Sequence, residues 1–231
     1  MPDNRDQHSR IKNLSIEGLK TISLSLFLAF GIRVGVAESF FIPTISMQPT
    51  LQIDDRLMVD KVSYRFNSPE RGDIIVFQPT EQALEKCGLP LNFRDAFIKR
   101  LIGLPGEQVE IKGGSVYING IPLTETYLAE KPQYQWGPMT VPSDAYLVLG
   151  DNRNSSCDSH AWGFIPHDHI IGRAFVRFWP VDRIGSLSKL SRDSLPNWSD
   201  QQFRSEILNR PNSRAFLRSP QEASRLLGAE V

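Results

Sequence analysis

The sequence contains few cysteines and no excess of charge of either sign. Its two cysteines, Cys87 and Cys157, are too few for a disulfide framework, and their spacing matches no zinc pattern. The 26 Lys and Arg residues balance 26 Asp and Glu residues, so there is no basic surplus to neutralise phosphates. We therefore expect no nucleic-acid partner. The sequence leaves open whether the two cysteines form a disulfide.

Several motifs of metal, nucleotide and hydrolase chemistry are also missing. The chain has no CxxC, HExxH, GxSxG or GxxxxGK motif, which removes the common zinc, nucleophile-elbow and P-loop hypotheses. It has no repeat of fixed period, which argues against a propeller or a solenoid. With 16 Gly, 16 Pro and 10% aromatic residues, the composition favours short strands and turns over a helical bundle.

The longest apolar run lies near the N-terminus. Residues 21–32 carry no charge, and after Arg33 the chain remains apolar as far as Ala37. A helix over residues 18–37 would span about 30 Å, the thickness of the hydrocarbon layer. Four basic residues precede the run, so the positive-inside rule predicts a cytoplasmic segment over 1–17 and an extracytoplasmic remainder. We therefore predict one N-terminal transmembrane helix, with the lipid bilayer as a partner.

A cleaved signal peptide is the main alternative to an anchor. A basic region, an apolar core and a small-x-small site at Gly35-Val36-Ala37 fit that description. Arg33, between the apolar core and that site, argues against cleavage. A buried core helix is disfavoured because the run is apolar on every side.

After residue 38 the sequence alternates short β-rich runs with turn signals. The runs are Arg56–Lys61, Asp73–Gln78, Ala96–Leu104, Gln108–Lys112, Ser115–Ile118, Tyr146–Leu149 and Ile170–Phe178. Gly113-Gly114 and Asn119-Gly120 flank one run and are typical of tight hairpin turns. The pattern predicts a mainly β, antiparallel domain over residues 38–183, with a small inserted β-meander within about 105–145.

The last segment, residues 184–231, has a different composition. It is rich in Ser and Arg and shows no strand pattern, although Ser199 and Gln202 have the spacing of a helix-capping box. We expect a polar, mobile tail with one or two marginal helices.

Three segments are candidates for chemistry, and the first surrounds Ser46. Pro43 and Pro49 restrict the backbone on both sides of this serine and exclude a regular helix. A serine held in a rigid, non-helical segment is a candidate nucleophile, whereas an ordinary turn is the plain alternative.

The second segment contains Lys99 in a predicted strand, where alternation puts Phe97 and Leu101 on the same face. Burial against that apolar face would lower the pKa of Lys99 from about 10.4, as a general base at neutral pH requires. Arg100 points to the opposite face. Alternation alone does not say which of the two cations is buried and which one snorkels.

The third segment is the loop after residue 149, which is rich in Asp, Asn, Ser and Gly. One interpretation is a turn stabilised by Asp151, Arg153 and Asp158. The other is that the hydroxyl of Ser155 or Ser156 orients a catalytic group. Beside them, we favour a small buried residue for the second cysteine rather than a reactive thiol.

Together, an N-terminal anchor, S-M-x-P-T-L, K-R-x-I-G-L-P-G-[DE] and G-D-N-R-x-x-S-x-D-S-x-x-W-G resemble the type I signal peptidases. The match spans Glu38 to Pro180 in the order of the family. The single-span layout is similar to enzymes of cyanobacteria, Gram-positive bacteria and chloroplasts. The resemblance implies a membrane-bound serine endopeptidase that removes signal peptides after small residues of A-x-A type, at the outer face of a plasma or thylakoid membrane.

The resemblance also implies roles for individual residues. Ser46 matches the nucleophile, Lys99 the general base, and Thr44 the hydroxyl that forms the oxyanion hole with the Ser46 backbone N–H. Ser156 matches the serine that hydrogen-bonds the lysine amine. Residues expected to support the site are Asp151, Arg153 and Asp158, and those expected to line shallow substrate pockets are Ile42, Met47, Leu51, Phe97 and Ile98.

The chain departs from the family pattern at His160, where several relatives carry Arg, so a salt bridge from Asp158 to this position is not implied. The short interval between Lys99 and Asp151 implies a reduced insert. Signal peptides are expected to bind extended along a strand edge. The resemblance implies no metal and no cofactor, and we expect a monomer.

Two other functions fit parts of the sequence. His160 could complete a Ser-His-Asp triad, and His167 with His169 could supply a base or a metal pair. A catalytically silent, membrane-tethered β-domain could bind signal peptides without cutting them. The presence of both Ser46 and Lys99 argues against that second function.

Overall fold

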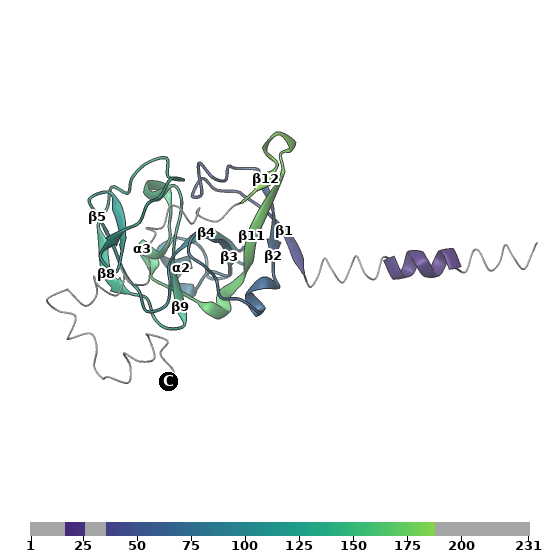
Figure 1. Cartoon of the computed structure of the whole chain (residues 1–231), viewed down its shortest axis with the longest axis horizontal. Coiled ribbons are helices and arrows are strands. Elements are labelled where there is room, and N and C mark those ends of the chain that lie inside the picture. The colour runs from purple at the N-terminus through teal and green to yellow at the C-terminus, as the bar shows by residue number, and fades with distance from the viewer. Residues whose placement is uncertain (1–16, 26–35, 188–231) are drawn as a thin grey trace, which may run out of the picture. The chain divides into compact units, whose positions relative to one another are not determined.

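Most strands in the described residues, 17–25 and 36–187, form one antiparallel sheet in the computed structural model (Figure 1). Its strands are β1 Ala37–Phe41, β2 Arg56–Asp60, β3 Ile74–Phe77, β4 Phe97–Gly103, β9 Ala145–Leu149, β10 Ile165–Pro166, β11 Ile170–Trp179 and β12 Gly185–Ser186. They are ordered β1-β2-β11-β3-β4-β9-β10, and β12 pairs with β11. β4 therefore lies inside the sheet, with β3 and β9 as neighbours.

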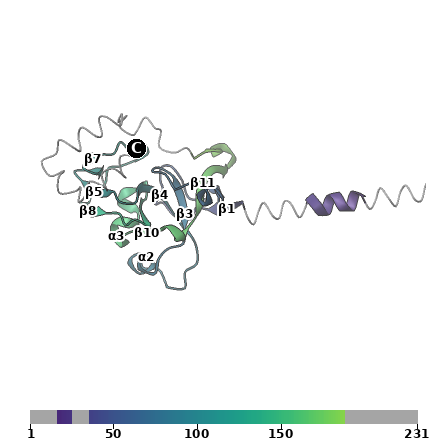
Figure 2. The same ribbon diagram turned by 60° about the horizontal axis from the view of Figure 1, so that its bottom comes forward.

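A second, four-stranded antiparallel sheet lies in the interval where the sequence predicts an inserted meander. Its strands are β5 Gln108–Lys112, β6 Ser115–Ile118, β7 Ile121–Pro122 and β8 Trp136–Thr140. Their order is β7-β6-β5-β8, and Figure 2 shows β5 between β7 and β8. The turn residues Gly113, Gly114, Asn119 and Gly120 all have positive φ, which explains the preference for Gly and Asn there.

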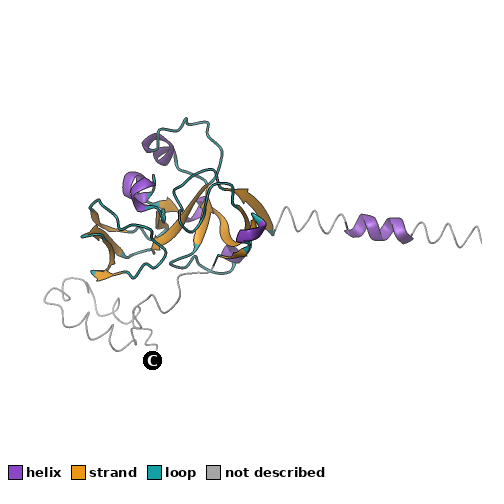
Figure 3. Ribbon diagram, turned by 90° about the horizontal axis from the view of Figure 1, so that it is seen from above, coloured by secondary structure: helices purple, strands orange, loops and turns teal. Residues whose placement is uncertain are grey.

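Short helices connect the strands (Figure 3). They are the α-helices α2 Glu81–Lys86 and α3 Ser159–Trp162 and the 3₁₀ turns η1 Ser63–Arg65, η2 Arg153–Ser155, η3 His167–His169 and η4 Val181–Arg183. Both α-helices begin at a side-chain cap. Thr80 accepts a hydrogen bond from the Ala83 N–H, and Asp158 accepts one from the His160 N–H.

The predicted anchor falls only in part on described residues. Residues 17–25 are helical, and Ala37, the last residue of the predicted anchor, is the first residue of β1. Within the described ranges no helix is both long enough and apolar enough to cross a membrane. The middle of the predicted span, residues 26–35, most of the N-terminal segment and the tail from residue 188 lie outside the described residues.

The prediction of a mainly β, antiparallel domain is confirmed. Each of the seven predicted runs contains a strand, and β5 and β6 match their predicted bounds. β1, β7, β8, β10 and β12 were not predicted: β8 contains Gly137-Pro138, which resembles a turn, and β7, β10 and β12 have two residues each. β12 also carries the sheet past the boundary predicted at residue 183, because Leu187 N donates to Phe175 O at 2.9 Å.

Three clusters of buried side chains hold the loops of the site. One brings Ile42, Met47 and Leu51, from the segment around Ser46, against side chains of β2, β3 and β4. A second packs α3 against β3, β4 and β9, and a third joins β9 to the small sheet. The segments on both sides of β4 are therefore fixed by core packing.

Candidate active site

Ser46 is buried in a turn between β1 and β2, and 7% of its surface is exposed. Gln48 N donates to Ile45 O at 3.0 Å, and Leu51 N donates to Met47 O at 2.9 Å. Met47 and Leu51 are fully buried, so they anchor this turn in the core. The segment is non-helical, as the flanking prolines predict. The hydrogen bonds and buried side chains of this turn hold Ser46 in place.

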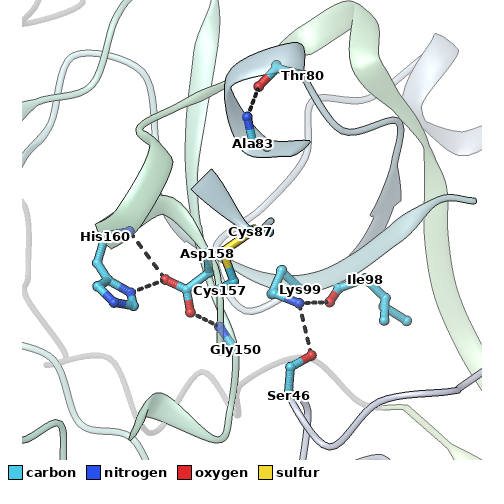
Figure 4. Close-up of a disulfide and its surroundings, with 10 residues drawn as sticks. All are labelled: Ser46, Thr80, Ala83, Cys87, Ile98, Lys99, Gly150, Cys157, Asp158 and His160. Carbon is cyan, nitrogen blue, oxygen red and sulfur yellow. Dashed lines mark hydrogen bonds and ion pairs between the residues drawn. A yellow bond between two sulfur atoms is a disulfide. The ribbon is translucent and has the colours of Figure 1, made fainter. Parts of the chain in front are cut away.

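Lys99 reaches Ser46 from the middle of β4 (Figure 4). Its Nζ donates to Ser46 Oγ at 2.9 Å and to Ile98 O at 3.0 Å. The Phe97 ring centroid lies 5.7 Å from the same nitrogen, and only 6% of the Lys99 surface is exposed. The structure thus brings together the serine and the lysine that the sequence singled out, 53 positions apart.

The electrostatics of this pocket change the protonation of Lys99. Burial lowers the pKa of Lys99 from its ordinary 10.5 to about 8 because the ammonium loses its water shell, while the carboxylates of Asp158 and Asp151 oppose that shift. At pH 7 about one lysine in ten is then neutral, against about one in 2,500 for an unshifted group. A neutral amine beside a hydroxyl is the arrangement of a general base and its nucleophile.

Arg100, the next residue on β4, is also buried, with 3% of its surface exposed. Its Nε and Nη2 donate to the two carboxylate oxygens of Asp151 at 2.7 and 2.6 Å, and its guanidinium lies 4.0 Å from the Tyr127 ring centroid. The expectation that one of the two cations snorkels is wrong, because a buried carboxylate pairs with Arg100. Asp151 therefore supports the strand that carries Lys99.

Thr44 lies beside the nucleophile position. Its Oγ1 is 3.3 Å from Ser46 Oγ, and the side chain comes from the exposed start of the turn. Within the described residues the Ser46 N–H donates no hydrogen bond. A free backbone N–H and a neighbouring hydroxyl are the two groups that the resemblance assigns to an oxyanion hole.

Ser156 does not make the predicted hydrogen bond to Lys99. Its Oγ is buried and has no hydrogen-bond partner among the described residues, and the lysine amine bonds to Ser46 and to a backbone carbonyl. Ser156 nevertheless packs close to the site. A Cβ added at Gly150 would lie 2.3 Å from Ser156 Oγ and 2.5 Å from Ser46 O, so Gly150 is the residue that lets both approach.

Asp158 is fully buried and binds His160, an interaction that the sequence left open. His160 Nδ1 lies 2.7 Å from one carboxylate oxygen, and Gly150 N donates to the other at 2.9 Å (Figure 4). The His160 ring stacks on Tyr134 at a centroid distance of 4.2 Å. Histidine thus occupies the place of an arginine by bonding through its ring nitrogen.

The alternatives built on histidine find no geometry to support them. Ser46 Oγ has Lys99 and Thr44 as its hydrogen-bond partners, and His160 bonds to Asp158. His167 lies against the Tyr146 hydroxyl, and His169 binds the carbonyl of Gln78. No group of metal-ligating side chains gathers anywhere in residues 17–25 and 36–187.

Arg153 ties the loop after β9 to the insert. Its guanidinium pairs with Glu125 and its Nε donates to Gly150 O at 3.1 Å, and both side chains of the pair are buried. Glu125 was not singled out from the sequence, because nothing in its local pattern marks it as buried. Arg100, by contrast, was noticed in the sequence because it stands next to Lys99 in a predicted strand.

The residues predicted to line substrate pockets divide into two groups. Ile42, Met47 and Leu51 have at most 1% of their surface exposed, so they are core residues and offer no open pocket wall. Ile98 keeps 9% exposed and Phe97 is half-buried. Contact with a substrate therefore remains a prediction for these two side chains.

A disulfide answers the open question about the cysteines. Cys87, which caps α2, and Cys157, between Ser156 and Asp158, are bonded with Cα atoms 5.8 Å apart (Figure 4). Cys157 is therefore no free reactive thiol, as expected, although it is half-buried and not fully buried. The bond holds the loop after β9, which we call the site loop, against α2.

Comparisons with known proteins identify relatives of this chain. Residues 15–179 match the family model described as signal peptidase, peptidase S26. The chain is 62% identical to a signal peptidase I of Leptolyngbya laminosa over 74% of this chain and 83% of the relative. It is 37% identical to the chloroplast thylakoidal processing peptidase 1 of Arabidopsis thaliana, over 76% of this chain and 52% of the relative. A crystal structure of a signal peptidase I from Enterococcus faecalis covers 46% of this chain and 97% of its own, with 35% identity and a TM-score of 0.38.

The family match and the relatives define a peptidase. The chain belongs to the signal peptidase family, peptidase S26.

Proposed function

We propose that this protein removes N-terminal signal peptides from exported proteins through a Ser46/Lys99 dyad. The observation that carries the proposal is the 2.9 Å hydrogen bond between Lys99 Nζ and Ser46 Oγ, both in side chains that are nearly inaccessible to water. The lowered pKa of Lys99 supports a role as general base.

The proposed reaction has two stages. Neutral Lys99 accepts the Ser46 hydroxyl proton while Oγ attacks the scissile carbonyl carbon, and the protonated lysine then gives that proton to the leaving amine. The signal peptide remains bound to Ser46 as an ester. Lys99 next activates a water that hydrolyses the ester and frees the serine.

The oxyanion of each tetrahedral intermediate would be held by the Ser46 N–H and the Thr44 hydroxyl. Each such donor contributes about 3 kcal/mol to transition-state stabilisation in comparable enzymes. Support comes from the Ser46 N–H, which has no partner within residues 17–25 and 36–187, and from the position of Thr44 Oγ1, 3.3 Å from the nucleophile.

We further propose a membrane-bound enzyme, anchored by residues 18–37, with its site outside the cytoplasm, in a plasma or thylakoid membrane. The apolar run in the sequence and the thylakoidal relative support this location. Ala37 is the last residue of the proposed anchor and the first residue of β1, and Ser46 follows it by nine residues. The site would then lie near the bilayer surface, where the helix of a signal peptide ends.

Specificity for small residues before the cut is part of the proposal. β9 pairs with β4 only from Arg100 onward, so the part of β4 before Arg100 has one open edge beside which an extended substrate would meet Phe97 and Ile98. Only 9% of Ile98 is exposed, so the contact surface there is shallow and suits a small side chain. Main-chain pairing with a strand edge would hold the peptide.

Cleavage of a precursor by the full-length protein in detergent tests this function. An Ala-x-Ala precursor should be cut after the second alanine, as mapped by the N-terminus of the product, and a precursor with Phe at both small positions should not. Ser46→Ala should be silent, whereas His160→Ala should keep its Ser46-dependent cleavage. Binding without cleavage by the wild type would instead favour a silent binding domain.

A further inference from the structure

Asn152 holds the two peptide groups on either side of Ser46. Its side-chain Nδ2 donates to Ile45 O at 3.2 Å, and its backbone N–H donates to Ser46 O at 3.0 Å. Asn152 was not among the residues singled out from the sequence, and neither its burial nor its charge marks it as functional. Asn152, in the loop after β9, nevertheless makes two hydrogen bonds to the backbone around the nucleophile, one to Ile45 and one to Ser46.

The side-chain contact falls on one particular peptide group. Ile45 C=O and Ser46 N–H belong to the same planar unit, so fixing the carbonyl fixes the direction of the N–H. That N–H has no partner in the described part of the chain. A hydrogen bond to the carbonyl also polarises the amide and makes its N–H a better donor.

The geometry of the loop suits this task. Asn152 is the N-cap residue of η2, where an Asn side chain ordinarily bonds to helix N–H groups, yet it makes no cap bond here. Its side chain is directed to Ile45 instead. The neighbouring residues, Asp151 and Arg153, are fixed by buried ion pairs with Arg100 and Glu125, so the loop offers Asn152 a rigid base.

We propose that Asn152 is a positioning residue that orients and polarises the Ile45–Ser46 peptide for its role in the oxyanion hole. The inference rests on the proposed Ser46/Lys99 function and deepens it. The turn bond from Gln48 N to Ile45 O holds the same carbonyl from the other side, so loss of Asn152 weakens the hole without abolishing it.

Steady-state cleavage of an Ala-x-Ala precursor by the full-length chain is the test, with Asn152→Ala and Asn152→Asp. We expect Asn152→Ala to lower kcat about tenfold and to keep KM within twofold of wild type. That decrease lies between the effect of losing one neutral hydrogen bond and the effect of losing an oxyanion donor. Asn152→Asp, which sets a carboxylate oxygen against Ile45 O, should be lower still.

Two further readouts separate positioning from mere support. A peptide aldehyde that adds Ser46 Oγ to its carbonyl forms an oxyanion-like hemiacetal, and its inhibition constant should rise by the same factor as kcat falls. The pKa in the pH profile of Asn152→Ala should equal that of wild type, because Lys99 is untouched.

Asn154→Ala is the matched control, since Asn154 lies on the same loop and bonds to Glu130, Lys131 and Gln133 but not to Ser46. It should keep wild-type kcat. The inference is overturned if Asn152→Ala cleaves and binds aldehyde like wild type, if its pKa shifts, or if Asn154→Ala loses as much. If the wild type neither cleaves nor binds the aldehyde, the proposed function itself fails, and this inference with it.

Discussion

At the scale of single residues, the protonation of Lys99 governs the proposed chemistry. The neutral amine is the active form, and the pKa of Lys99 is lowered to about 8 by burial. We therefore expect kcat/KM for an Ala-x-Ala precursor to rise with pH through about 8 and to level off above it. A profile already flat from pH 6 upward would contradict a lysine base with that pKa.

Gly150 makes a second prediction at this scale. A side chain there would meet Ser46 O and Ser156 Oγ at distances that no real Cβ adopts. Gly150→Ala should therefore displace the nucleophile's turn and lower kcat by at least about tenfold, since a small misplacement of reacting groups costs up to about 100-fold. Gly163→Ala, where the added carbon meets nothing within 4 Å, is the space control, although its positive φ adds some strain. Equal activities of the two variants would contradict the steric argument.

Sequence reasoning reached some of these residues and missed others for physical reasons. Ser46 and Lys99 were candidates because of the prolines and the strand pattern around them, and the resemblance to the type I signal peptidases then assigned their roles. Ser156 was given a hydrogen bond to Lys99 that the described residues do not show, because the resemblance carries over a role but not the side-chain geometry. The position of Asn152 depends on contact between loops 107 positions apart, which no local pattern encodes.

At the scale of elements, buried ion pairs join β4 to the loop after β9. Arg100 and Asp151 form a bidentate pair with 3% and 0% of their side chains exposed, and Thr50 donates to the same carboxylate at 2.5 Å. Asp151→Ala leaves a buried guanidinium without its partner, which typically costs about 3–5 kcal/mol. Urea unfolding of the variant should show that loss.

The matched control for this pair is Glu38→Ala, which breaks the more exposed ion pair with Lys61 at 3.0 Å. Exposed pairs contribute about 0–1 kcal/mol, so little change is expected there. If both variants lose equally little unfolding free energy, Arg100 is solvated or paired well enough without Asp151. The buried pair then does not stabilise β4.

The disulfide is the other link between elements. It joins α2 to the site loop across 70 positions, and such a cross-link stabilises a fold by about 2–5 kcal/mol. The double variant Cys87→Ser with Cys157→Ser should lower the unfolding free energy by that amount. Reduction of the wild type should lower its melting temperature and leave that of the double variant unchanged. An equal response to reductant would mean that the bond does not form in the protein.

Strands were more predictable than their partners. The runs at β5 and β6 carried both alternation and turn residues, so even their ends were predictable. β1 lies where the apolar run ends, and its five residues have no alternation of their own. The pairing of β1 with β2, and of β4 with β9, depends on contacts distant in sequence that alternation cannot specify.

At the scale of the molecule, two antiparallel sheets place a dyad from distant segments in one buried spot. The larger sheet supplies Lys99 from its interior and the turn of Ser46 from beside its edge strand, while the connection between β7 and β8 of the small sheet supplies Glu125, the buried partner of Arg153. The sequence predicted the class of this architecture and the two central residues. It did not predict the pairings that bring them together.

The central claim is that Lys99 is the base for Ser46, and one measurement tests it most directly. Initial rates of precursor cleavage by the full-length protein should be compared for Lys99→Ala and for Lys61→Ala, a lysine of the surface ion pair. We expect the cleavage rate of Lys99→Ala to fall about 100- to 10,000-fold, the range for loss of a general base, while the rate of Lys61→Ala stays near wild type. Retention of more than a tenth of the wild-type rate by a folded Lys99→Ala would contradict the dyad.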